Sequence, residues 1–256
     1  MTYLCSIDNE HLLYFSIPMI QPAIDPALSQ LQNKLWRTFH HTCKTYSLLE
    51  DGDRVLVGLS GGKDSLALVE LLGRQAQIFK PRIEVVAVHV RVKERKYMSD
   101  LTYLASFCKE AGVRFIVRDT AIAGEEKKDP CFLCSWYRRK ALFEVAREEQ
   151  CNKLAFGHHK DDVLHTALLN LIYVGRYSSI EPALALDKMP LTLIRPLYDI
   201  DEKDILQYAS LRGYVKQQAL CPFEKHSQRT QMEHLIEQLQ KFNPNVRESM
   251  MHALNR

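Results

Sequence analysis

The stretch RVLVGLSGGKDSLALVELL, residues Arg54–Leu72, decides the fold that we expect of this chain. Its first six residues are mostly apolar, which is typical of a strand buried on both faces of a parallel sheet. The turn Ser-Gly-Gly-Lys-Asp-Ser follows directly, and an apolar pattern with helical spacing begins after it. A strand, a glycine-rich turn and a helix in this order predict the start of a βαβ unit.

The same alternation continues along the chain. Four further strands are predicted at residues 83–90, 114–119, 153–158 and 191–198, and helices at 65–75, 100–112, 135–150, 161–173 and 201–213. An earlier amphipathic helix is expected from Pro26, with Asp25 as its N-cap, to about Leu49. The pattern predicts a doubly wound α/β fold with a mainly parallel five-stranded sheet and helical extensions at both ends.

Three parts of the chain are expected. Residues 1–47 form an N-terminal arm and amphipathic helix, residues 48–213 the sheet core, and residues 214–256 a C-terminal extension. The composition is that of a globular protein: 256 residues, 46% hydrophobic, 25% charged and a net charge of +3. Seven scattered cysteines do not suit a secreted disulfide framework, and neither a signal peptide nor a membrane span is visible, so a cytoplasmic location is expected.

The turn after the first core strand has the features of a phosphate-binding site. Gly61 and Gly62 allow the backbone to approach oxygen atoms closely, and Lys63 adds a full positive charge. The helix that begins near Asp64 directs its positive end to the same place. The motif is not the P-loop of kinases and GTPases, because only three residues separate Gly58 from Gly62 and Asp64 follows the lysine.

A second polar motif, AFGHHKDD at residues 155–162, ends the fourth strand and opens the next helix. Ligands bind at the carboxyl ends of strands in doubly wound sheets, so His158 and His159 are expected at the same edge as the glycine-rich turn. Asp161 and Asp162 stand where a helix N-terminus favours carboxylates and where magnesium could be held. Plain N-capping by Asp161 is the alternative.

Two cysteines stand in C-x-x-C spacing at Cys131 and Cys134, just before a predicted helix. Such a pair can ligate a metal ion or a cluster, with Cys221 as a candidate third ligand. Thioredoxin-like redox chemistry and a chance pair of buried thiols are the alternatives, and Cys221 alone would suit an ordinary buried residue.

The turn SGGKDS resembles the PP-loop of the ATP pyrophosphatase superfamily. Within it the chain is similar to the tRNA 2-thiocytidine biosynthesis family over about Asp25–Arg229. The matching pieces are SGGKDS, the cysteine pair before a basic helix, GHHKDDVLHTALLNLIY, IRPL at 194–197, EKDI at 202–205, and Cys221 with Gln228-Arg229 beyond it. The chain departs from the family at His165, where many relatives carry an acidic or amide residue.

The resemblance implies an adenine-nucleotide α-hydrolase-like fold and an ATP-dependent tRNA sulfurtransferase. AMP would be transferred to the C2 oxygen of a cytidine, at tRNA position 32, and sulfur would replace that oxygen by way of a [4Fe–4S] cluster. A cysteine desulfurase is an expected sulfur donor.

The resemblance also implies roles for individual residues. The expected catalytic residues are Lys63, Asp64, Asp161, Cys131, Cys134 and Cys221. The expected ATP-binding residues are Ser60, Gly61, Gly62, Lys63, Asp64, Ser65, His89, Gly157, His158, Asp161 and Asp162. Cys131, Cys134 and Cys221 would hold the cluster, and Asp64, Asp161 and Asp162 would hold Mg²⁺.

Two basic segments suit an RNA partner. The expected contacts are Arg91, Lys93, Arg95, Lys96, Arg138, Arg139 and Lys140. Lysine and arginine contact phosphates, and the neighbouring aromatic residues could stack an unpaired base. A solvated helix face, with Trp136 in the core, explains the same pattern. The N-terminal amphipathic helix could pack on its own sheet or against a second subunit, so a homodimer is possible.

Two other functions fit parts of the sequence. One is a ligase with the same nucleotide turn that activates a carbonyl for attack by nitrogen, as lysidine synthetases do. The other is a sensor that binds nucleotide and cluster without turnover. The iron content of the protein distinguishes the first from a thiolase, and catalytic silence would indicate the second.

Overall fold

The structure is a computed structural model that describes residues 25–93, 97–122, 130–215, 218–219 and 228–255. Its helices are α1 (Pro26–Thr45), α2 (Lys63–Ala76), α3 (Leu101–Glu110), α4 (Pro130–Glu148), α5 (Lys160–Val174), α6 (Glu202–Leu211), α7 (Gln228–Phe242) and α8 (Val246–Leu254). Its strands are β1 (Arg54–Gly58), β2 (Glu84–Val92), β3 (Tyr97–Met98), β4 (Arg114–Thr120), β5 (Lys153–Ala155), β6 (Ala183–Ala185), β7 (Thr192–Ile194) and β8 (Gln218–Ala219).

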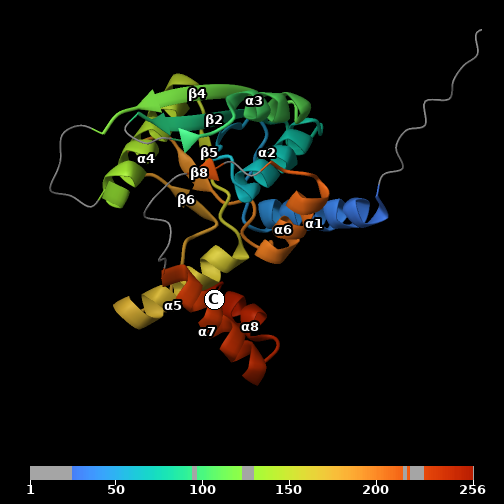
Figure 1. The fold of residues 1–256 in the computed structure, drawn as a ribbon, viewed down its shortest axis with the longest axis vertical. Coiled ribbons are helices and arrows are strands. Elements are labelled where there is room, and N and C mark those ends of the chain that lie inside the picture. Colours follow the sequence, from blue (N-terminus) through green and yellow to red (C-terminus); the bar gives the residue numbers. More distant parts are fainter. Residues whose placement is uncertain (1–24, 94–96, 123–129, 216–217, 220–227, 256) are drawn as a thin grey trace, which may run out of the picture.

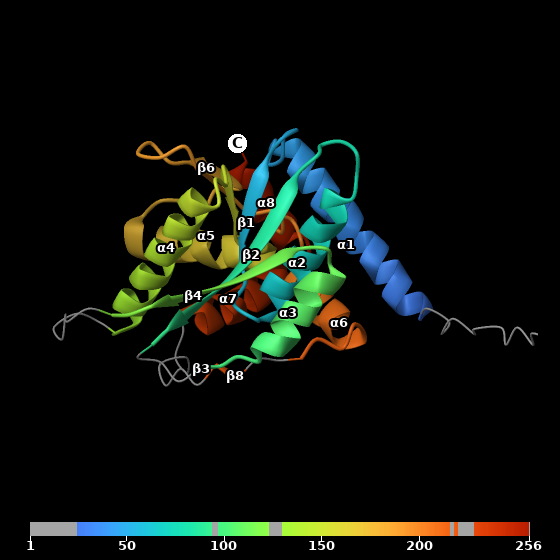
Figure 2. The ribbon, with the colours of Figure 1, turned by 90° about the horizontal axis from the view of Figure 1, so that it is seen from above.

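The main sheet has six strands in the order β4-β2-β1-β5-β7-β6 (Figures 1 and 2). The five predicted strands are parallel, and β6 pairs antiparallel with β7. The predicted number of five strands is therefore wrong by one. β6 was missed because it is only three residues long and two of its side chains are exposed, so it lacks the apolar run of a buried strand.

The direction in which successive strands are added to the sheet reverses between β1 and β5. The chain leaves β1 for β2 and β4 on one side, and returns through α4 to β5 on the other side of β1. The carboxyl ends of β1 and β5 therefore meet at the topological switch point, where doubly wound sheets bind ligands.

Three apolar clusters hold the layers together. The largest lies between one face of the sheet and α1, α2, α3 and α6, and the second lies between the other face and α4 (Figure 2). The third joins α5, α7 and α8 through side chains such as Leu164, Leu168, Met232 and Met251. The C-terminal helices therefore pack directly against the helix that carries Asp161 and Asp162.

The first helix begins as predicted. Asp25 caps α1 by accepting from Ala27 N at 2.9 Å, and Pro26 occupies the first turn. The helix ends at Thr45, short of Leu49, and its apolar face packs into the protein's own core through Leu35 and Phe39. Of the two expected packing arrangements for this face, the structure has the intramolecular one.

The helix after the cysteine pair begins earlier than expected. It was predicted at residues 135–150, with both cysteines before it, but α4 begins at Pro130 and includes Cys131 and Cys134. Proline is favoured in the first helical turn, where its missing N–H costs no hydrogen bond, so it can open a helix at this point. The cysteine pair therefore belongs to the first turns of α4.

No helix in the described ranges is both long enough and apolar enough to span a membrane.

Candidate active site at the β1–β5 strand ends

The glycine-rich turn is held closed by its own serines. Ser60 Oγ lies 3.1 Å from Ser65 Oγ and accepts from Gly62 N at 3.3 Å, while Ser65 Oγ donates to the Gly62 carbonyl at 2.9 Å. Gly61 has a φ of 86°, a left-handed conformation that favours glycine. Because Gly62 is the N-cap of α2 and has no side chain, the first N–H groups of the helix have no side-chain cap. This is the geometry of an anion site.

The turn after β5 packs directly on this anion site. A Cβ atom at Gly157 would lie 3.1 Å from the carbonyl carbon of Asp64 and 3.3 Å from Ser65 N, so only glycine fits without displacement. His159 is the N-cap of α5, and the Asp162 carboxylate accepts a hydrogen bond from His159 N at 3.2 Å. The sequence prediction that the two motifs share one edge of the sheet is confirmed.

Four acidic side chains surround the ring of His159. Its Nε2 atom lies 3.7 Å from Asp64, 3.7 Å from Asp162 and 4.0 Å from Glu202, and its Nδ1 atom lies 3.8 Å from Asp161. The three predicted magnesium ligands are thus brought together. Within the described ranges, however, no group of three or more His, Cys, Asp or Glu side chains has the geometry of a metal site.

The carboxylates nevertheless fit magnesium in their chemistry. Mg²⁺ prefers hard oxygen ligands and is usually held by one or two carboxylates together with the phosphates of the substrate. A complete protein cage is therefore not expected at such a site, and Asp64, Asp162 and Glu202 stand at the edge of the turn where a phosphate would complete it.

Lys63 is held by two acids at the start of α2. Its Nζ lies 2.7 Å from Glu202 and 3.1 Å from Asp64. Burial lowers the pKa of Lys63, but the hydrogen bond that its ammonium donates to Glu202 and the charge of Asp64 outweigh that effect, so the pKa is raised above its ordinary value. The lysine is therefore charged at neutral pH, as a phosphate ligand must be.

Asp161 is anchored on both of its oxygens. Oδ2 accepts from the backbone N–H of Glu202 at 2.7 Å, and Oδ1 pairs with Arg247 at 2.8 Å. Burial raises the pKa of Asp161, but the bonds from Arg247 and the Glu202 backbone overcome it, so the pKa is lowered. The alternative that Asp161 caps its own helix is not what the structure shows, because the capping carboxylate belongs to Asp162.

His89 supports the turn from the neighbouring strand. It is buried in the second half of β2, beside the end of β1, and its Nδ1 atom donates to the Leu59 carbonyl at 2.8 Å. Burial lowers its pKa, and the charges of Arg138 and Arg91 lower it further, so the ring is neutral at pH 7. Within the described residues its Nε2 atom is a buried acceptor without a partner, which suits a donor group of a bound nucleotide.

The cysteines are described only in part. Cys134 is half-buried in α4, whereas the side chain of Cys131 and all of Cys221 lie outside the described residues. Ala219, two residues before Cys221, pairs with Tyr97 in the small β3–β8 sheet. The expected ligand set of three thiols fits an iron–sulfur cluster in its chemistry.

The predicted RNA contacts have different surroundings. Arg91 forms two bonds with Asp119, at 2.7 and 2.8 Å, and Lys93 is exposed. Arg95 and Lys96 lie outside the described residues. On α4, Arg139 and Lys140 are exposed, and Arg138 is half-buried.

Two aromatic side chains are exposed near the start of α4. Trp136 is 47% exposed and Phe132 58%, and the ammonium of Lys140 lies 5.6 Å from the centre of the Trp136 ring. The interpretation that places Trp136 in the core is wrong.

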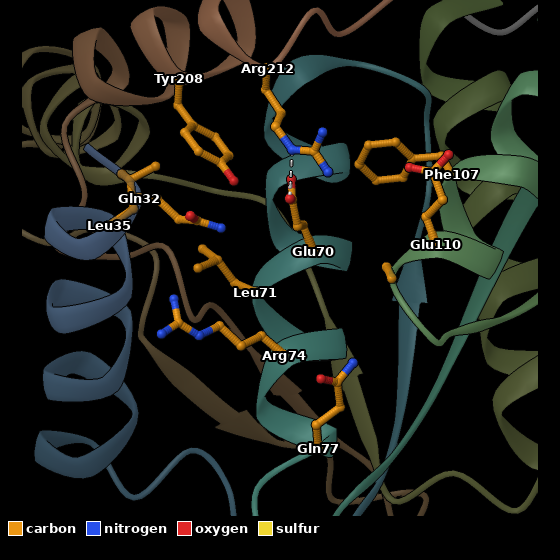
Figure 3. A pocket seen from close by; sticks show the side chains of 11 residues that line it. Gln32, Leu35, Glu70, Leu71, Arg74, Gln77, Phe107, Glu110, Tyr208 and Arg212 are labelled. Carbon is orange, nitrogen blue, oxygen red and sulfur yellow. Dashed lines mark hydrogen bonds and ion pairs between the residues drawn. The ribbon is translucent and has the colours of Figure 1, made fainter. Parts of the chain in front are cut away.

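A separate cavity of about 190 Å³ lies between α1, α2, α3 and α6 (Figure 3). It opens beside the second half of α2, whereas the glycine-rich turn is at the start of that helix. Glu70 at its wall accepts from Arg212 Nε at 2.9 Å and from the Tyr214 hydroxyl at 2.6 Å. The cavity has no glycine-rich turn, so it is not the expected nucleotide site.

Two residues of the site were missed by sequence reasoning. Glu202 stands in the EKDI segment after the strand at 191–198, and the rule that strand ends share an edge could have placed it near Lys63. Arg247 lies in the polar tail, where no local pattern points to the site. Only the packing of α8 against α5 brings it there.

A strand-end anion site of this kind defines a nucleotide-binding protein of the PP-loop class. The family model for the PP-loop domain matches residues 28–217. The chain is 35% identical over 234 residues to a tRNA-cytidine(32) 2-sulfurtransferase of Marinobacter nauticus, covering 89% of this chain and 77% of the relative. It is 33% identical to the enzyme of the same name from Geotalea daltonii, covering 90% and 92%. The chain therefore belongs to the tRNA-cytidine(32) 2-sulfurtransferase family within the PP-loop proteins.

The fold is also similar to a solved structure. The U34-tRNA thiolase NcsA of Methanococcus maripaludis, determined with its [4Fe–4S] cluster, matches with a TM-score of 0.70 and 26% identity. The match covers 90% of this chain and 79% of that protein.

Proposed function

We propose that this protein is an ATP-dependent tRNA thiolase that replaces the C2 oxygen of a cytidine, at position 32, by sulfur. The observation that carries the proposal is the meeting of the SGGKDS and GHHKDD turns at the β1–β5 switch point, with Lys63 charged and the first N–H groups of α2 uncapped. The names of the related enzymes and of the cluster-bearing thiolase support the substrate and the cofactor.

The first step is the transfer of AMP. The cytidine C2 oxygen attacks the α-phosphorus of ATP, the bond to the bridging oxygen breaks, and pyrophosphate leaves. Negative charge grows on the leaving oxygens, so catalysis consists mainly of positioning and electrostatic stabilisation. The uncapped N–H groups at the start of α2, the Lys63 ammonium and the serines of the turn hold the departing phosphates. His89 Nε2 accepts a hydrogen bond from the nucleotide.

The acidic side chains at the strand ends include the proposed ligands of Mg²⁺. Mg²⁺, when bound, offsets the charge of the phosphates. Asp64 and Asp162, whose carboxylates each lie 3.7 Å from His159 Nε2, are the proposed ligands. Asp161 is held on both oxygens and keeps the start of α5 in place. The ring of His159 lies within 3.8 Å of each of these carboxylates.

The second step replaces the activated oxygen. A sulfur nucleophile attacks C2, and AMP leaves with the former C2 oxygen. Cys131, Cys134 and Cys221 would hold a [4Fe–4S] cluster, which would supply an iron able to bind sulfur. The sulfur comes from a donor such as a cysteine desulfurase. Trp136 and Phe132 stack an unpaired base of the tRNA loop, and the cations of α4 contact its phosphates.

The test combines metal analysis with a product assay. Anaerobically purified protein should contain about four irons and four acid-labile sulfides per chain, and should form 2-thiocytidine in tRNA with ATP. Cys131→Ala and Cys221→Ala should both lose the cluster and the product while retaining ATP binding. Cys151→Ala is the matched control, because that buried thiol lies at the start of β5, away from the strand-end site.

Other outcomes would contradict the proposal. Zinc or no metal, with pyrophosphate release that depends on an added amine, would indicate a ligase of the lysidine type. An intact cluster and tight ATP binding without any tRNA product would indicate a sensor. An active Cys221→Ala enzyme would exclude the cluster from the reaction.

A further inference from the structure

Arg247 connects the C-terminal helix to the nucleotide edge of the sheet. It is the second residue of α8, and only 16% of its side chain is exposed. Nη1 lies 2.8 Å from Asp161 at the start of α5, and Nη2 lies 2.8 Å from Asp201, the N-cap of α6. One guanidinium thus joins two turns that leave different strands of the sheet.

The contacts of Asp161 continue from Arg247 to the phosphate turn. The other carboxylate oxygen of Asp161 accepts from the backbone N–H of Glu202 at 2.7 Å. The carboxylate of Glu202 in turn lies 2.7 Å from Lys63 Nζ. A continuous path of hydrogen bonds therefore runs from α8 through Asp161 and Glu202 to the lysine of the SGGKDS turn.

The anchoring of α8 makes this path rigid. Met250 and Met251 are buried against α5 and α7, and the Tyr177 hydroxyl donates to the Met250 carbonyl at 2.9 Å. A planar guanidinium presents several N–H donors in a fixed fork and reaches two carboxylates at once, whereas an ammonium is a single point charge. The geometry therefore calls for arginine, not merely for a positive charge.

We propose that Arg247 is a positioning residue for ATP, which fixes Asp161 and Glu202 so that Lys63 is aimed at the phosphate site. The C-terminal helix is thereby part of the nucleotide site, although it contributes no group to the substrate. The inference rests on the proposed function only in taking ATP as the nucleotide.

The experiment measures the dissociation constant of Mg·ATP by calorimetry on Arg247→Gln and Arg247→Lys, with the melting temperature of each variant recorded. Arg247→Gln should raise the dissociation constant at least about tenfold. Arg247→Lys keeps the charge and should retain a melting temperature near that of the unmodified protein. It should still raise the dissociation constant about threefold or more, because it cannot bridge both carboxylates.

A control on the same helix separates positioning from a general effect of α8. Glu248 lies next to Arg247, 62% of its side chain is exposed, and it pairs with Lys160 of α5 at 3.6 Å without contacting Asp161. Glu248→Gln should leave the dissociation constant unchanged. A purely structural role of Arg247 would lower the melting temperature of both arginine variants and leave their ATP affinity, measured below that temperature, unchanged.

The outcomes separate the inference from the proposed function. An unchanged dissociation constant in folded Arg247→Lys overturns the inference, even if Arg247→Gln fails to fold. Because the binding assay uses neither tRNA nor iron nor sulfur, a failure of the protein to thiolate tRNA would leave the inference about Arg247 standing. A lack of ATP binding by the unmodified protein would overturn both.

Discussion

Gly157, in the turn after β5, packs against the backbone of Asp64 in the glycine-rich turn. A Cβ atom on Gly157 would stand 3.1 Å from the carbonyl carbon of Asp64 and 3.2 Å from its carbonyl oxygen. Asp64 belongs to the first turn of α2, whose N–H groups form the anion site. The backbone that follows β5 therefore sets how far the phosphate turn can move.

Gly157→Ala should weaken ATP binding. The added methyl group has to push the first turn of α2 away, because its neighbours are backbone atoms, and overpacking of this kind costs about 1–3 kcal/mol. We expect a rise of about tenfold in the dissociation constant of Mg·ATP, measured by calorimetry. Gly58→Ala is the control, because its Cβ would meet only the methyl groups of Leu142, at 3.6 and 3.7 Å. Equal affinities in the two variants would contradict the prediction.

The position of the candidate site at the carboxyl ends of the strands was predictable from the sequence. The contact of Asp161 with Arg247, which holds the site from the C-terminal helix, was not predictable. The apolar strands and the glycine-rich turn follow local rules, and the rule for strand ends is enough to place Asp64 near Asp161 and Asp162. The pairing of Asp161 with Arg247 depends on how α8 packs against α5, and such a contact between distant segments leaves no periodic signal. The short strand β6 was missed for a similar reason, since three residues at an edge carry little pattern.

The start of α4 shows a second feature that the sequence alone did not determine, namely the residue at which a helix begins. The cysteine pair is expected just before the helix because the helical pattern is read from Ser135 to Gln150. The chain opens the helix at Pro130 instead. Boundaries of helices are decided by capping and packing together, and the local sequence allowed both starts.

Glu202 should act in two opposing ways on Lys63. Its charge competes with phosphate for the ammonium, while its hydrogen bond of 2.7 Å aims the side chain. Glu202→Gln keeps an acceptor but removes the charge, and a charged hydrogen bond is worth about 1 kcal/mol more than a neutral one. We therefore expect about fivefold tighter binding of ATP in Glu202→Gln, measured by calorimetry.

Glu202→Ala provides the comparison for that variant. It removes both the charge and the acceptor, so Lys63 is no longer aimed, and ATP should bind less tightly than to Glu202→Gln. Equal affinity in the Gln and Ala variants would mean that Glu202 only competes with phosphate and has no orienting role.

Three cysteines should resist alkylation in the folded protein. Burial raises the pKa of Cys43 and of Cys108 to about 12 and that of Cys151 to about 11. Because the thiolate is the reactive form, at most about one in a thousand of these thiols is ionised at pH 8. Iodoacetamide followed by peptide mass spectrometry of cluster-free protein should find these three unmodified until denaturant is added. Rapid modification of any of them in the native state would show that its burial is not maintained.

Trp136 should contribute to tRNA binding. Trp136 is 47% exposed on α4, two residues beyond Cys134, and stacking of a base on an aromatic ring is worth about 1–3 kcal/mol. Trp136→Ala should therefore raise the dissociation constant for tRNA at least about fivefold at fixed salt, measured by fluorescence anisotropy. Because the ring packs on no core cluster of the described residues, the melting temperature should change little.

Phe79 is the matched control for that substitution. It is an aromatic side chain, 82% exposed, and it follows the far end of α2, opposite to the end that carries the SGGKDS turn. Phe79→Ala should leave tRNA binding unchanged if the RNA lies over α4 and the strand ends. An equal loss in both variants would place the RNA contact elsewhere, whereas a loss confined to Trp136→Ala would locate the unpaired base beside the cysteine pair.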